Sequence, residues 1–129
     1  MDFKYNKIMI IDDDEIDNYL VKVLIKNNKI AEQILEFNSG LDAIKYLEEN
    51  KEIEENLPEV ILLDLYMPLM DGMEFVKAFD SLNLNVSGKC KICVVSGSVD
   101  DNDILKTKNT NNIFSYTTKP ITVDFLESL

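Results

Sequence analysis

The stretch VILLDLYMPLMDG, residues 60–72, decides how this chain folds. Its first four residues are apolar, and a short apolar run bounded by turn residues is typical of a strand that is buried on both faces. Such a strand needs a layer of structure on each side, so we expect it near the centre of a parallel sheet. Asp64 ends the run, and it should lie at the carboxyl end of the strand, where open α/β sheets bind ligands.

Turn and capping residues follow Asp64. Pro68 and Gly72 interrupt the apolar pattern and predict a loop. Asp71 precedes Glu74 by three residues, which is the spacing of a capping box at the start of a helix. The stretch therefore predicts a strand, a short loop and a helix in direct succession.

The rest of the chain alternates between apolar runs and helical patterns. Five strands are predicted at residues 8–11, 33–37, 60–64, 91–95 and 113–117. Five helices are predicted to start near residues 14, 39, 71, 100 and 122, and the one at 100–112 has few apolar residues to anchor it. In the first helix, one apolar face is expected to contain Ile16, Leu20, Val23 and Leu24. The alternation predicts an α/β fold, a flavodoxin-like doubly wound parallel sheet with strand order 2-1-3-4-5.

Composition limits the functions that the chain can have. Its 129 residues favour one domain spanning residues 1–129. The net charge of -11 without a basic cluster argues against direct binding of nucleic acid. There is no histidine, so His-based catalysis and a role as a phosphohistidine carrier are excluded. All basic residues are lysines, so any phosphate chemistry must use lysine, a metal ion or backbone N–H groups.

Neither end of the chain nor its cysteines indicate a special compartment. The first residues lack the layout of a signal peptide and no apolar run is long enough to span a membrane, so we expect a cytoplasmic protein without membrane contact. Cys90 and Cys93 have a Cys-x-x-Cys spacing, which can indicate a redox or metal site. Residues three apart in a strand point to opposite faces, however, so we interpret both as reduced structural thiols.

Acidic residues follow two strands that are neighbours in the predicted order. Asp12 and Asp13 follow the first strand and Asp64 ends the third, so three carboxylates should meet in one crevice. Two such charges about 4 Å apart repel by roughly 4 kcal/mol at an effective dielectric near 20, so the cluster must bind protons or a cation. Oxygen ligands with room for water favour Mg²⁺, with Mn²⁺ as a possible substitute.

A hydroxyl and an ammonium should border the same crevice. Ser96 ends the fourth predicted strand and Lys119 follows the fifth. Mg²⁺ and Lys119 together would balance three carboxylates, and a phosphoryl group on Asp64 would find positive charge and donors around it. Each residue alone is better explained as a turn or surface residue. Their shared position at strand ends indicates a phosphoryl-transfer site with Asp64 as the nucleophile.

The segment DLYMPLMDG, residues 64–72, resembles the phosphoacceptor motif of two-component response regulator receiver domains. The resemblance implies that Asp64 is phosphorylated. It also implies that Asp13 binds the metal directly, that Asp12 acts largely through water, and that the backbone carbonyl of Tyr66 is a further ligand. It covers nearly the whole chain, so we expect a stand-alone receiver of the chemotaxis type.

The resemblance also assigns roles to residues near the carboxyl terminus. Ser96 corresponds to the family's switch hydroxyl, Lys119 to its essential lysine, and the Lys119–Pro120 bond to its cis peptide. Tyr116 corresponds to the aromatic residue that turns inward when the hydroxyl engages the phosphoryl group. A histidine kinase or histidine phosphotransfer protein is the implied donor. The switch is expected to remodel the face of the fourth helix, fifth strand and fifth helix for a downstream protein.

Two alternatives remain. A pseudo-receiver would bind partners without phosphorylation, although the acidic, hydroxyl and lysine residues are all present. An aspartate phosphatase similar to haloacid dehalogenases also carries Asp after an apolar strand, but it needs a second Asp two residues later, where this chain has Tyr66. We therefore expect a signalling switch rather than an enzyme, limited to self-phosphorylation from small donors and autodephosphorylation.

Overall fold

A computed structural model describes residues 2–84, 90–97 and 113–129. Its centre is a sheet of five parallel strands in the order β2-β1-β3-β4-β5. The strands are β1 (Tyr5–Ile11), β2 (Ala31–Phe37), β3 (Val60–Asp64), β4 (Lys91–Ser96) and β5 (Ile113–Thr118). The predicted fold class and strand order are therefore confirmed.

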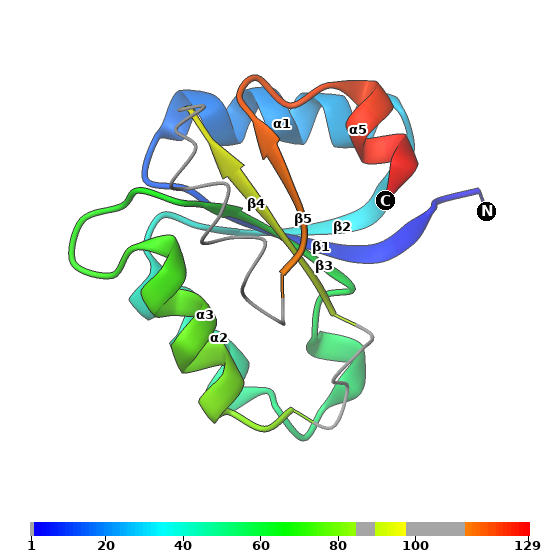
Figure 1. Ribbon diagram of the computed structural model, residues 1–129. Helices are drawn as coiled ribbons and strands as arrows, with labels where there is room; N and C mark the ends of the chain where they lie inside the picture. The colour runs from blue at the N-terminus through cyan, green and yellow to red at the C-terminus, as the bar shows by residue number, and fades with distance from the viewer. Residues whose placement is uncertain (1, 85–89, 98–112) are drawn as a thin grey trace.

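Helices cover both faces of the sheet. They are α1 (Glu15–Asn27), α2 (Gly40–Glu49), α3 (Gly72–Ser81) and α5 (Val123–Ser128), with a 3₁₀ turn, η1 (Glu54–Asn56), before β3. Figure 1 shows α1 and α5 on one face and α2 and α3 on the other. The described residues thus hold four α-helices, and the predicted count of five is not confirmed; the helix expected at 100–112 lies outside them. None of the described helices has the length and apolar content needed to cross a bilayer.

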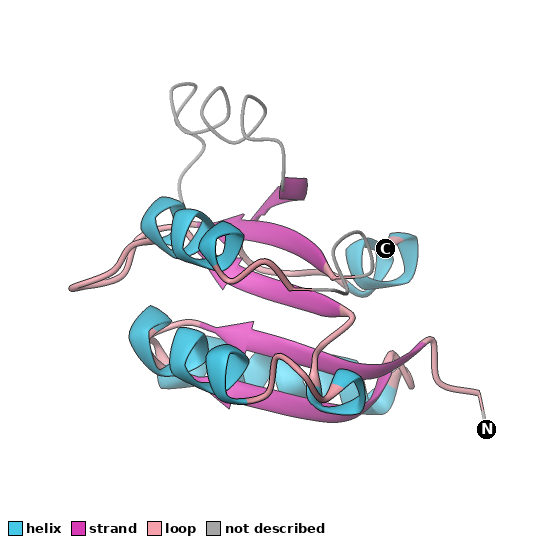
Figure 2. Ribbon diagram, turned by 90° about the horizontal axis from the view of Figure 1, so that it is seen from below, coloured by secondary structure: helices cyan, strands magenta, loops and turns pink. Residues whose placement is uncertain are grey.

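The core consists of two apolar layers separated by the sheet. Every residue of β3 is buried, as its continuous apolar run predicts. Ile61 and Leu63 face the layer under α2 and α3, whereas Val60 and Leu62 face the layer under α1 and α5. Because β3 has helices on both sides, it is fixed from both faces, and Asp64 at its end has a defined position (Figure 2).

Capping residues start the helices where the sequence predicts. Asp14 accepts hydrogen bonds from the backbone N–H groups of the first turn of α1. The capping box at α3 is complete, since Asp71 accepts from the Glu74 N–H at 2.9 Å and Glu74 accepts from the Asp71 N–H at 3.0 Å. These caps replace hydrogen-bond partners that the first turn of a helix lacks. They fix the residue at which α1 and α3 leave the edge of the sheet.

Most of the apolar face predicted for the first helix is exposed rather than turned toward the core. The large apolar residues of α1 that are more than a third exposed are Ile16 (71%), Tyr19 (63%), Leu20 (52%) and Val23 (37%). The helix instead buries Asn18 and Ile25 and packs Val21 and Leu24 against the core. Spacing defines a stripe but not the direction in which it faces. The direction is set by contacts at the sheet edge, including a hydrogen bond from Asn18 to the backbone of Asp12.

The two cysteines lie on opposite sides of the sheet, as predicted. Cys93 is buried in the layer under α1 and α5, and Cys90 packs against the other layer. Burial, followed by the nearby Cys93, raises the pKa of Cys90 to about 12, and burial also raises the pKa of Cys93. Thiols with raised pKa values form little reactive thiolate, which agrees with a structural role.

Candidate functional site

Three carboxylates meet at the carboxyl ends of β1 and β3, as the sequence predicts. Asp12 and Asp13 follow β1, Asp64 ends β3, and these two strands pair directly. One carboxylate oxygen from each residue lies within 4.8 Å of the others. Asp12 and Asp64 are buried and Asp13 is exposed. The cluster therefore has a buried base and an open side from which an ion or a phosphoryl donor can enter.

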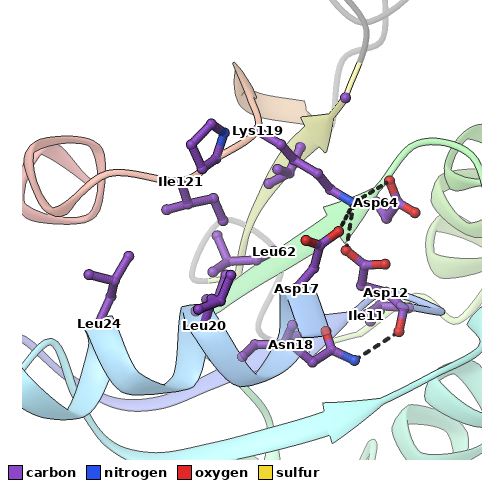
Figure 3. A pocket seen from close by; sticks show the side chains of 15 residues that line it. Ile11, Asp12, Asp17, Asn18, Leu20, Leu24, Leu62, Asp64, Lys119 and Ile121 are labelled. Atoms are coloured by element: carbon purple, nitrogen blue, oxygen red, sulfur yellow. Dashed lines mark hydrogen bonds and ion pairs between the residues drawn. The ribbon is translucent and has the colours of Figure 1, made fainter. Parts of the chain in front are cut away.

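Asp12 is held in place through its backbone as well as its side chain. Its N–H donates to the carbonyl of Phe37 at 3.1 Å, and its carbonyl accepts from Asn18 Nδ2 at 2.9 Å (Figure 3). Its Oδ1 accepts from the backbone N–H of Asp14 at 2.9 Å. Asn18 is fully buried, and the sequence analysis missed it. One signal for it was available in the sequence. Asn18 lies three residues before Val21 and seven before Ile25, so helical spacing places it on the same buried face.

The surroundings of Asp64 favour its protonated form. Burial is the main cause and the Asp12 charge the next. Together with the charge of Asp13 they raise the pKa of Asp64 to about 7, although Lys119 acts in the opposite direction. A carboxylate with this pKa is poised near neutral pH and gains from a cation beside it. The donor set agrees with such a cation, because it consists of closely spaced oxygens with an open side, as Mg²⁺ and Mn²⁺ sites require.

Lys119 reaches the carboxylates from the loop after β5. Its Nζ lies 2.8 Å from Asp12 Oδ2, 2.8 Å from Asp17 Oδ2 and 3.5 Å from Asp64 Oδ1 (Figure 3). Burial lowers the pKa of Lys119, but the bonds to Asp12 and Asp17 and the charges on Asp64 and Asp12 outweigh burial and raise it above its ordinary value. Lys119 is therefore a fixed positive charge in the site.

The sequence analysis missed Asp17 as a partner of Lys119. Asp17 belongs to the acidic run at the start of α1, which by itself indicates only a helix start. Its partner, Lys119, lies 102 positions away in the sequence. No spacing rule connects two such positions, so only the folded chain reveals the contact.

The other predicted site residues lie on β4 and β5 and in the loops after β3 and β5. Ser96 is fully buried at the end of β4, next to the strand that carries Asp64. The backbone N–H of Lys119 donates to the Ser96 carbonyl at 2.8 Å, and the Lys119–Pro120 peptide bond is cis, as the family resemblance implies. Tyr116 is partly buried on β5 against the α2 and α3 layer, and Tyr66 is 56% exposed in the loop after β3.

A cavity of about 340 Å³ lies beside the carboxylates, between α1 and residues 119–121. Asp64, Asp17 and Lys119 line its polar part. Its apolar lining includes Leu20, Leu24, Leu62, Val95 and Ile121 (Figure 3). Leu20, one of the exposed apolar residues of α1, thus lines the same cavity as Asp12 and Asp64.

Solved structures with the same architecture include response regulators. A two-component response regulator from Cytophaga hutchinsonii superimposes with a TM-score of 0.88 and 29% identity, covering 95% of this chain and 92% of that one. The Mn²⁺-bound form of the response regulator Rcp1 has a TM-score of 0.74 and 25% identity, covering 95% and 88%.

Sequence comparisons give the same family. Rcp1 of Synechocystis is 34% identical over 68 residues, 52% of this chain and 46% of its own length. The transcription regulator BvgA of Bordetella pertussis is 34% identical over 80 residues, 62% of this chain and 35% of its own length. The chain thus spans between a third and a half of these relatives. Residues 8–129 match the response regulator receiver domain, so this chain belongs to the receiver domain family of two-component signalling.

Proposed function

We propose that residues 1–129 form one receiver domain that accepts a phosphoryl group on Asp64 from a phosphohistidine donor. The observation that carries the proposal is the meeting of the Asp12, Asp13 and Asp64 carboxylates beside the ammonium of Lys119. Receiver domains are signalling domains rather than enzymes, and in general they work with a two-component kinase. The donor is therefore a histidine kinase or a histidine phosphotransfer protein.

The metal ligands in this proposal are the carboxylates of Asp12, Asp13 and Asp64 and the backbone carbonyl of Tyr66. Asp13 would contact the ion directly, and Asp12 would act largely through water. Mg²⁺ is the proposed ion and Mn²⁺ its substitute, in keeping with the Mn²⁺ bound to Rcp1. When bound, the ion offsets the charge of the carboxylates and of the transferring phosphoryl oxygens.

Transfer to Asp64 is a single displacement at phosphorus. A carboxylate oxygen of Asp64 forms the new P–O bond while the P–N bond to the donor imidazole breaks. The electron pair of that bond remains on the imidazole nitrogen, which takes a proton from solvent. Lys119 and the Ser96 hydroxyl donate hydrogen bonds to phosphoryl oxygens, so the chain stabilises the reaction by position and charge.

The phosphorylated state is proposed to act as a conformational switch. Ser96 moves toward the phosphoryl oxygens, and the partly buried Tyr116 turns inward with it. Ser96 ends the strand that pairs with β5, and Tyr116 lies on β5 itself, so the change would reach the face formed by β5 and α5, where a downstream protein would bind. Amide exchange over residues 113–118 should change on phosphorylation; identical exchange in the two states would contradict the switch.

The donor is proposed to dock on the apolar stripe of α1, which consists of Ile16, Tyr19, Leu20 and Val23. All four are exposed, and Leu20 lines the cavity that Asp64 also lines. An exposed apolar patch next to a reactive group suits a protein partner. With a net charge of -11, contact with nucleic acid or an anionic membrane is not part of the proposal, and the cytoplasm is the proposed location.

Incubation with acetyl phosphate and Mg²⁺, followed by intact mass measurement, tests the central step. The wild-type chain should gain one phosphoryl group, and Asp64→Asn should gain none. Asp71→Asn is the matched control, because Asn also caps helices well and the same charge is lost nearby. Absence of labelling in the wild type would contradict the proposal and favour a pseudo-receiver. Repeated turnover of phosphate esters would instead favour a phosphatase.

A further inference from the structure

Lys119 makes its two shortest ion pairs with residues other than Asp64. Its Nζ lies 2.8 Å from Asp12 Oδ2 and 2.8 Å from Asp17 Oδ2, against 3.5 Å from Asp64 Oδ1 (Figure 3). An ammonium has three N–H donors, and hydrogen bonds weaken beyond about 3.2 Å. Asp12 and Asp17 therefore determine where the ammonium rests, and the contact with Asp64 is the weakest of the three.

The start of α1 leaves the Asp17 carboxylate available for this contact. Asp17 is the third residue of α1, where an acidic side chain in a capping box would accept the N–H of the capping residue. That residue is Asp14, and its N–H already donates to Asp12 Oδ1 at 2.9 Å. The backbone of Asp17 is itself anchored, since its N–H donates to Asp14 Oδ1 at 3.2 Å. The carboxylate is thus held at a fixed place facing Lys119.

Within Lys119, the side chain can respond to a change at Asp64, whereas the backbone is held. Its backbone N–H is bound to the Ser96 carbonyl at 2.8 Å. A phosphoryl group on Asp64 adds negative charge and acceptor oxygens on the side where the ammonium now makes its longest contact. Of the two short contacts, the one to Asp17 is easier to give up. The Asp17 side chain is 34% exposed and water can replace the lysine, whereas the Asp12 side chain is 9% exposed.

Building on the proposed function, we propose that Asp17 is a positioning residue that holds Lys119 away from Asp64 in the unphosphorylated chain and competes with the phosphoryl group for its ammonium. Phosphorylation then exchanges the Lys119–Asp17 pair for a Lys119–phosphoryl pair. Asp17 sets how strongly the chain favours its phosphorylated state without contacting the phosphoryl group itself.

Binding of beryllofluoride, a mimic of the phosphoryl group on Asp64, provides a test without turnover. Titrations at saturating Mg²⁺ are followed by amide NMR signals. Asp17→Asn keeps the size of the side chain and removes its charge, so beryllofluoride should bind about fivefold more tightly, as expected for losing one partly exposed ion pair. Asp17→Glu keeps the charge and should bind like the wild type. Asp17→Ser is a second charge-removing variant, in case Asp17→Asn is poorly folded.

Glu15→Gln is the matched control. Glu15 lies in the same first turn of α1 and is exposed, so the variant loses the same charge without removing a contact to Lys119. If wild-type Asp64 takes up neither acetyl phosphate label nor beryllofluoride, the proposed function fails and this inference fails with it. If the wild type binds beryllofluoride but Asp17→Asn binds no more tightly than Glu15→Gln, only this inference is overturned. Tighter binding by Asp17→Glu, equal to that of Asp17→Asn, also overturns it.

Discussion

The backbone carbonyl oxygen of Asp64 lies 2.9 Å from the place that a β-carbon on Gly72 would occupy. The Cα of Leu65 lies at the same distance. The N–H of Gly72 also donates to the Leu65 carbonyl at 2.8 Å, so α3 begins directly against the end of β3. Both neighbours are backbone atoms and cannot rotate away. Gly72 therefore allows the close approach that fixes the strand end carrying Asp64.

Gly72→Ala should lower the free energy of unfolding by about 2 kcal/mol, because the added methyl group forces the backbone at Asp64 and Leu65 to move. Urea unfolding measures the loss. Gly97→Ala is the matched control, since a β-carbon on Gly97 would meet no heavy atom within 4 Å, and its effect should stay within about 0.5 kcal/mol. Equal effects of the two substitutions would argue against the close approach as the cause.

Asp64→Asn should stabilise the metal-free chain, and the gain should depend on pH. The pKa of Asp64 is raised from an ordinary value of 3.8 to about 7 in the folded chain. The folded state then holds a proton that the unfolded state releases, so the contribution of Asp64 to stability falls as pH rises from about 4 to about 7. Asn cannot ionise and escapes this loss. With chelator present, the advantage of the variant in urea unfolding should be about 2 kcal/mol larger at pH 8 than at pH 5. A difference that does not change with pH would contradict the raised pKa.

Leu69→Asn should raise the free energy of unfolding by about 0.5–1 kcal/mol. Leu69 has φ of 69°, and the Met70 N–H donates to the Pro68 carbonyl across it at 2.8 Å. A positive φ costs a bulky residue conformational free energy, and Asn tolerates this conformation better. The Leu69 side chain is 89% exposed, so little burial is lost. Leu69→Ala keeps the β-carbon and should be close to neutral; an equal gain from Ala would point to lost surface hydrophobicity instead.

Replacing part of the apolar stripe of α1 should slow phosphoryl transfer from a protein donor but not from a small-molecule donor. In the double variant Ile16→Ser with Tyr19→Ser, transfer from a phosphorylated histidine protein that labels the wild type should slow about tenfold. Labelling by acetyl phosphate should be unchanged, because both side chains are exposed and neither lines the cavity at Asp64. Ile53→Ser is the control, as Ile53 is 42% exposed just before η1, on the amino-terminal side of β3 and not at its carboxyl end. An equal slowing by Ile53→Ser, or slower labelling by acetyl phosphate, would contradict docking on α1.

The sequence alone determined the architecture and the identity of the acidic cluster. The continuous apolar run of β3, bounded by turn residues, is typical of a strand buried on both faces, and alternation with helices implies a parallel sheet. In such a sheet every carboxyl end lies on one edge, so Asp12, Asp13 and Asp64 had to come close. Caps such as Asp71 are local signals, because the hydrogen bonds that they make span only three residues.

The tertiary structure alone decided which way α1 faces and which partners Lys119 holds. Helical spacing gives the residues of a stripe, but the rotation of the helix follows from contacts with the sheet, and here α1 buries Asn18 and leaves Leu20 half exposed. The pair between Lys119 and Asp17 joins positions 102 residues apart. Contacts of that kind depend on side-chain distances that arise only when β5 and α1 are packed against one another, so no local pattern in the chain encodes them.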